Sequence, residues 1–203
     1  MAIKPILFNT EMVRAILDGR KACTRRILKG AIPFDEKAEY WNVLKKGEWS
    51  GPICVEYFIK QGSPYQTGDI LYVRETWSLR FDGEKYFYKA DKNTSREEKR
   101  LLDYDDVRWH PSIHMPKEAA RIWLKVTDVK VEMLQNITSK QICKEGVEVE
   151  EPHVLNGEEK RYAFSILWNS TIKKSELDRY GWDANPLVWA IEFERCEKPE
   201  VVK

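Results

Sequence analysis

Short stretches with the residue types and spacing of β-strands recur along this chain of 203 residues and leave room only for short helices between them. The stretch Ile70–Glu75 alternates in period two and is predicted to be a central strand, and Ile122–Val131 is predicted to be a long strand bent by a bulge. The other predicted strands cover 3–8, 86–89 and 187–193. This succession predicts an α+β fold organised around a closed or half-closed barrel.

Three helices are predicted between these strands. Thr10 is the expected N-cap of the first, in which Val13, Ile16 and Leu17 recur at helical spacing, and Gly19 is its expected left-handed end. Thr138 opens a capping box for a second helix that ends at Gly146. The third covers 162–172, where apolar residues again follow the helical period.

The length of the chain suits a single domain, 1–203, with large insertions. Residues 30–67 mix glycine, proline and aromatic residues, which is typical of an elaborated insertion, and we predict a hairpin near Ile53–Ile59. Residues 91–108 are charged and are predicted to form an exposed excursion.

The charges nearly cancel, since 34 basic and 33 acidic side chains leave a net charge of +1. Such a chain has no global field that attracts a polyanion, so nucleic acid would have to bind through a local patch. The sequence has eight Trp and nine Tyr, which either fill a core rich in large rings or stack on bases.

Four scattered cysteines lack C-x-x-C spacing and do not resemble a disulfide framework. We therefore expect reduced thiols and a cytoplasmic protein. No apolar run approaches the roughly 20 residues of a membrane span, and no signal peptide is recognisable, so no membrane partner is expected.

The ordered motifs of the chain resemble those of a known family. Segment 17–26 reads LDGRKACTRR and is similar to the G-R-K-T-x-T-x-R motif of ASCH domains, which belong to the PUA-like superfamily. Segment 68–73 (GDILYV), the helix that ends at Glu145-Gly146, and segment 188–193 (VWAIEF) resemble later blocks of that family. Further blocks at 74–77 (RETW), 111–116 (PSIHMP) and 180–183 (YGWD) resemble a larger ASCH-like group found in phages and prophages.

This resemblance implies a PUA-like β-barrel with flanking helices and a cleft that binds a nucleobase, a nucleoside or RNA. A branch of small bacterial ASCH proteins hydrolyses the acetyl amide of N4-acetylcytidine. Its catalytic residues fall on Lys21, Thr24 and Glu145 of this sequence. The chain differs from those enzymes by Ala22 within the first motif and by insertions at about 30–66, 91–117 and 147–160.

The same residues support two further hypotheses. As a non-catalytic RNA-binding module of phage origin, the chain would use a substrate-binding set of Arg20, Arg25, Arg26, Glu75, Trp77 and Trp182. If these residues neither catalyse nor bind RNA, the cations between Arg20 and Lys29 form a solvated part of the protein surface. A metal-dependent RNase is the minor alternative, with His110 and His114 as candidate ligands, but Pro111 and Pro116 disfavour the helix that would align them. We expect no metal and no cofactor, and the oligomeric state is left open.

Overall fold

The structure is a computed structural model that describes residues 1–33, 40–45, 48–49, 51–79, 86–91, 108–148 and 158–200. Its main sheet has five strands in the order β1 (Ile3–Leu7), β7 (Ile70–Arg74), β10 (Trp123–Met133), β11 (Leu187–Cys196) and β2 (Cys23–Ile27). The pair β1–β7 is parallel, and the other neighbours are antiparallel. The predicted α+β class is confirmed, and β7 lies inside the sheet as expected.

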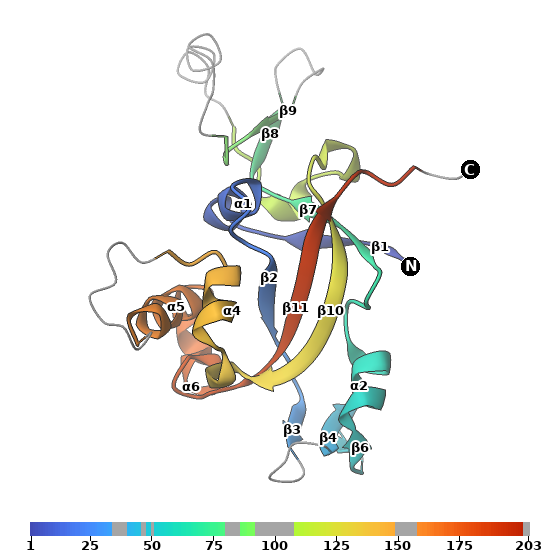
Figure 1. Ribbon diagram of the computed structural model, residues 1–203, viewed down its shortest axis with the longest axis vertical. Helices are drawn as coiled ribbons and strands as arrows, with labels where there is room; N and C mark the ends of the chain where they lie inside the picture. Colours follow the sequence, from blue (N-terminus) through green and yellow to red (C-terminus); the bar gives the residue numbers. More distant parts are fainter. Residues whose placement is uncertain are drawn as a thin grey trace.

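The sheet bends because its two longest strands bend together. β10 and β11 pair along almost their whole length, and their register shifts between Val126 and Asp128. Such an irregularity increases the local twist and bend of a strand. Figure 1 shows β10 and β11 curving as one long ribbon past β2. The bulge predicted for this strand is therefore present.

The two edge strands, β1 and β2, close the barrel only in part. Among the described residues no backbone ladder joins them, and they meet through a side chain instead. The Arg26 guanidinium on β2 donates to the Leu7 carbonyl on β1 at 2.6 Å and lies 5.3 Å from the centre of the Phe8 ring. Of the two predicted forms, a closed or a half-closed barrel, this arrangement agrees with the half-closed one.

The helices lie on the flanks of the sheet. α1 (Thr10–Leu17) is capped by Asn9, whose side chain accepts from the Met12 N–H, so the expected cap at Thr10 is one residue late. α4 (Ser139–Lys144) has the predicted capping box at Thr138. α5 (Glu158–Ser170) and α6 (Leu177–Tyr180) gather with α4 beside β2, as Figure 1 shows. Short 3₁₀ turns cover Ser112–His114, Lys117–Ala119, Leu134–Asn136 and Lys174–Glu176.

A smaller unit follows β2 in the chain. It comprises β3 (Ala31–Pro33), β4 (Tyr40–Lys45), β5 (Glu48–Trp49), β6 (Ile53–Cys54) and α2 (Val55–Gly62). The hairpin predicted near Ile53–Ile59 is wrong, because only the first two of these residues pair, and with β4. The rest is helical, and it places Phe58 against Trp189 of β11 with the rings 5.4 Å apart. Burial of this aromatic pair favours a helix over a strand there.

A two-stranded ribbon, β8 (Trp77–Leu79) and β9 (Tyr86–Tyr88), follows β7. The predicted excursion at 91–108 and most of the predicted insertion at 147–160 fall on residues 92–107 and 149–157, outside the described residues.

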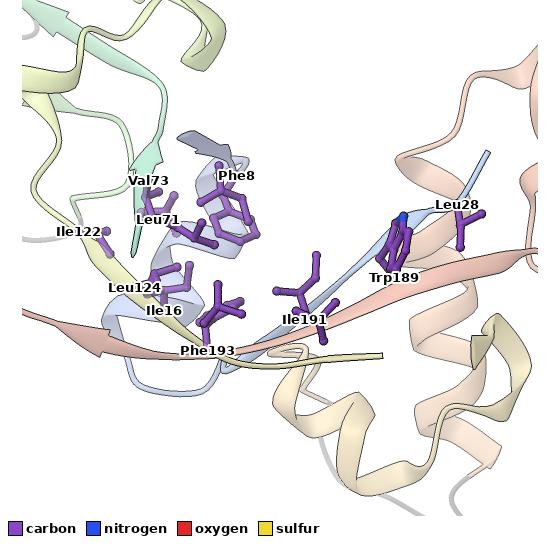
Figure 2. Packing of buried hydrophobic residues seen from close by; sticks show 14 of the residues in the cluster. Phe8, Ile16, Leu28, Leu71, Val73, Ile122, Leu124, Trp189, Ile191 and Phe193 are labelled. Atoms are coloured by element: carbon purple, nitrogen blue, oxygen red, sulfur yellow. The ribbon is translucent and has the colours of Figure 1, made fainter. Parts of the chain in front are cut away.

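The main core joins α1 and α2 to the strands of the sheet. Figure 2 shows Phe8 and Ile16 packed toward Leu71, Leu124 and Phe193, which come from the neighbouring strands β7, β10 and β11. A second cluster joins α4 and α5 to the sheet through Ile142, Phe164, Trp168 and Val188. Several of the tryptophans are therefore core residues, as one of the two interpretations of the composition expected. No helix in the described ranges is long and apolar enough to cross a membrane.

Two glycines with left-handed backbone end α1 and α4, and one of them is also sterically required. Gly19 has φ +75° and nothing within 4 Å of the position that a Cβ would take. Gly146 has φ +84°, and a Cβ there would lie 2.8 Å from Ala15 Cβ and 3.1 Å from Lys21 Cβ. Gly146 therefore allows the end of α4 to pack directly on α1 and Lys21.

We expect Gly146→Ala to destabilise the protein by about 3 kcal/mol or more, because strain at positive φ adds to a clash with Ala15. Gly19→Ala is the matched control and should cost only about 1–2 kcal/mol, since it has the strain without the clash. Urea unfolding of the two variants measures the difference. Equal losses of stability would show that the contact of α4 with α1 is not tight.

Candidate functional site

The site forms where the start of β2 meets the end of α4. The Ala22 N–H donates to the Lys144 carbonyl at 2.7 Å, and Lys21 and Glu145 form an isolated antiparallel bridge. This backbone pairing brings together two segments that are 124 residues apart in the chain. The side chains of Lys21 and Glu145 are consequently neighbours.

Lys21 and Glu145 form a buried ion pair. Lys21 Nζ lies 2.6 Å from Glu145 Oε2 and also donates to the Glu145 carbonyl at 3.0 Å. The Lys21 side chain is 0% exposed, and its ammonium lies 5.7 Å from the centre of the Phe8 ring. Such a pair is stable only when both charges keep their partners, since an uncompensated buried charge is costly.

Two more charged residues extend this pair into a network. Arg25 donates to Glu145 Oε1 at 3.0 Å and, through Nε, to Glu132 Oε1 at 2.9 Å. Burial lowers the pKa of Arg25, but the carboxylates of Glu145 and Glu132 outweigh burial and raise its pKa overall. Lys21, Arg25, Glu132 and Glu145 therefore sum to zero charge. We call these four residues the ion network.

The thiol of Cys23 lies against the ion network. It is buried, and the Arg25 guanidinium approaches its Sγ at 3.7 Å. Burial, followed by the charge of Glu145, raises the pKa of Cys23 to about 12. The thiol therefore stays protonated at neutral pH and is not a nucleophile in the folded protein.

A pocket of about 50 Å³ lies beside the ion network, along the outer edge of β2. Thr24, Arg25 and Arg26 of β2 and Glu145 at the end of α4 form its polar side. Its other side is lined by Met12 of α1, by Phe164, Leu167 and Trp168 of α5, and by Thr171, which follows α5. An apolar wall facing a few polar groups is the usual character of a small-molecule site.

Arg26 gives the pocket a positive charge in excess. Burial lowers the pKa of Arg26, an effect that the nearby Tyr65 and Glu145 only partly oppose. Within the described ranges no carboxylate lies within ion-pair distance of its guanidinium, and its single hydrogen bond goes to the Leu7 carbonyl. Since the ion network is neutral, Arg26 favours a ligand that presents an oxygen or an anionic group.

The structure therefore brings together only part of the set taken from the sequence. Thr24, Arg25, Arg26 and Glu145 line the pocket, and Lys21 lies beneath Glu145 with no exposed side-chain surface. Arg20 lies outside the pocket, where it binds the Gly146 carbonyl, Asp18 and Glu148. Glu132 was missed, because period two along β10 cannot show which of its several charged side chains meets Arg25.

The other three predicted substrate-binding residues are not among those that line the pocket. Glu75 is 1% exposed, and both its oxygens accept from Arg121 at 3.0 Å. Trp77 stacks on His110 with the rings 4.9 Å apart, and Trp182 packs edge-on against Phe164. A role of these three in binding stays a prediction.

The minor metal hypothesis gains no support from the histidines. His114 ends a 3₁₀ turn that is exposed, and His110 is held against Trp77. In the part of the chain that the structure describes, no three His, Cys, Asp or Glu side chains gather as a metal site would need.

Comparisons with known proteins find a similarity among solved structures. No family model matches the chain, and no curated protein matches it. The crystal structure of an ASCH domain from Lactobacillus crispatus JV V101 is similar over 96% of this chain and 79% of that one, with 13% identity and a TM-score of 0.38.

We expect Glu145→Gln to destabilise the protein by about 3–5 kcal/mol, because Lys21 and Arg25 would remain buried without their shared carboxylate. Glu192→Ala is a suitable control, since it removes the 2.8 Å partner of Lys144 from a partly exposed pair that joins α4 to β11, and should cost about 1 kcal/mol or less. Urea unfolding measures both. A similar small loss in each variant would show that the ion network contributes little.

The pKa of Cys23 predicts which thiols react. At pH 8, iodoacetamide should modify the exposed Cys54 and Cys143 in the native protein and Cys23 only after unfolding. Folding raises the pKa of the Cys23 thiol from 9.0 to about 12. Between these two pH values the thiol is protonated in the folded protein and loses its proton on unfolding, so the contribution of Cys23 to the free energy of unfolding falls as pH rises. Peptide mass mapping of the labelled protein identifies the sites. Rapid native labelling of Cys23 would contradict its burial.

Proposed function

We propose that the chain binds a nucleobase or nucleoside, either free or at an exposed position of RNA, in the pocket beside β2. The observation that carries this proposal is the pairing of an apolar wall from α5 with the polar groups of Thr24, Arg26 and Glu145. A heterocyclic base has the same two characters, with apolar faces and a polar edge.

The two sides of the pocket would contact different parts of the ligand. Trp168 is fixed in place, since its Nε1 donates to the Tyr180 carbonyl at 2.8 Å, and it offers a rigid apolar surface to a ring. The guanidinium of Arg26 would donate to a carbonyl or phosphate oxygen of the ligand. Because one cation is in excess there, binding of a phosphate through Arg26 should weaken as salt rises.

Hydrolysis of an N4-acyl cytidine amide is a second candidate, and the position of Thr24 in the same pocket as Glu145 favours it. Thr24 Oγ would attack the acyl carbon and give its proton to the Lys21 amine. Lys21 must first pass a proton to Glu145 Oε2, which lies 2.6 Å away. Glu145 would then protonate the leaving N4 amine, and water would hydrolyse the acyl-threonine to release the acid.

Calorimetric titration with cytidine tests binding, and the ultraviolet spectrum of N4-acetylcytidine tests hydrolysis. We expect Arg26→Gln to weaken cytidine binding about tenfold, the loss of a charge-assisted hydrogen bond. Thr24→Ala should keep binding and lose turnover by at least about 100-fold. Lys29→Gln, an exposed cation outside the pocket, is the control for a general charge effect.

The outcomes separate the hypotheses. Binding without turnover in the wild-type protein would favour the non-catalytic RNA-binding module, and a salt-dependent gel shift with single-stranded RNA would then extend it. Turnover that survives Thr24→Ala would exclude the threonine mechanism. Absence of binding by any nucleoside or RNA would overturn the proposed function.

A further inference from the structure

The backbone of β2 has one side that pairs with β11 and one that faces the pocket. The Phe193 N–H donates to the Ala22 carbonyl, and the Leu28 N–H donates to the Leu187 carbonyl, both at 2.9 Å. Between these two bonds, Thr24 lies opposite Ile191 and Arg26 opposite Trp189. In an antiparallel pair, hydrogen-bonded residues alternate with residues whose N–H and C=O point away. The N–H and C=O of Arg25 therefore point to the open edge of β2.

The surface exposure of Arg25 agrees with this direction. Its side chain is 1% exposed, because Glu132 and Glu145 enclose the guanidinium, whereas the whole residue is 5% exposed. The surface that remains therefore belongs to the main chain. Arg25 lines the pocket although its side chain is sequestered in the ion network.

No other segment completes the hydrogen bonding of this edge in the described part of the chain. α4 pairs only with the beginning of it, through the Ala22 N–H and the Lys144 carbonyl. No hydrogen bond from a described residue reaches the outward N–H or C=O of Arg25. Backbone groups that face a pocket in this way need water or a ligand as a partner.

The size of the pocket selects the kind of ligand. At about 10–15 Å³ for each water molecule, a volume of about 50 Å³ holds only a few waters. That space suits the edge of one planar ring rather than an added peptide strand, which would extend along β2. Met12 and Leu167 supply apolar surface for the faces of such a ring.

We propose that the main-chain N–H and C=O of Arg25 bind the edge of a heterocyclic ring that carries a hydrogen-bond acceptor beside a donor. This inference rests on the proposed function and specifies its ligand. In cytosine, N3 would accept from the Arg25 N–H, and the N4 amino group would donate to the Arg25 carbonyl. N4-acetylation leaves one N4 hydrogen, so an acylated cytosine keeps both bonds.

The test compares cytidine with N4,N4-dimethylcytidine, which lacks the N4 hydrogens, by calorimetry on the full-length protein. We expect at least about a tenfold weaker affinity for the dimethyl compound, since the Arg25 carbonyl loses its donor. Amide hydrogen exchange by NMR locates the contact. Cytidine should slow exchange of the Arg25 amide at least about tenfold, whereas the Thr24 and Arg26 amides, already bonded to β11, are internal controls.

Each result has a separate meaning. Cytidine binding with unchanged exchange at Arg25 and equal affinity for the dimethyl compound would overturn the backbone contact and leave the proposed function standing. Binding of neither nucleoside, nor of RNA, would instead refute the proposed function itself. Slowed exchange at Arg25 together with weaker binding of the dimethyl compound would establish the edge of β2 as the base-reading element.

Discussion

The buried ion pair between Lys21 and Glu145 is the constraint on which the rest of the site depends. An ammonium removed from water requires a carboxylate at hydrogen-bonding distance, and Glu145 meets that need only if α4 ends against β2. The close approach in turn requires glycine at position 146, where any side chain would meet α1. Fold and site therefore depend on the same contact, since Glu145 lines the pocket and its ion pair with Lys21 also holds the end of α4 against β2.

Much of the fold could be predicted because it follows from local rules. Strands with period two, the capping box at Thr138 and the left-handed glycines at 19 and 146 depend on neighbours in sequence, and all are present. Asn9 rather than Thr10 caps α1, an error of one residue where two adjacent residues can both serve. The helix after Ile53–Cys54 was mistaken for a hairpin, because its burial depends on Trp189, which lies far along the chain.

The site was harder to predict, because its contacts join distant segments. The resemblance of segment 17–26 to a known motif drew attention to Lys21 and Thr24, and the structure places Lys21 against Glu145. No sequence pattern could show that Glu132 would hold Arg25, or that Arg121 would enclose Glu75. The pocket-facing backbone of Arg25 was equally invisible, because it depends on the register between β2 and β11.

The seam between β1 and β2 has a mechanical consequence. Strands joined by a ladder separate only when several backbone hydrogen bonds break together, whereas this seam is held by the Arg26 side chain at Leu7 and Phe8. Loss of the hydrogen bond from Arg26 to Leu7 would cost about 1.5–3 kcal/mol, the contribution of a hydrogen bond with a charged group. Parting β1 from β2 at this point would break no ladder of backbone hydrogen bonds, and Arg26, which bridges the two strands, also lines the pocket.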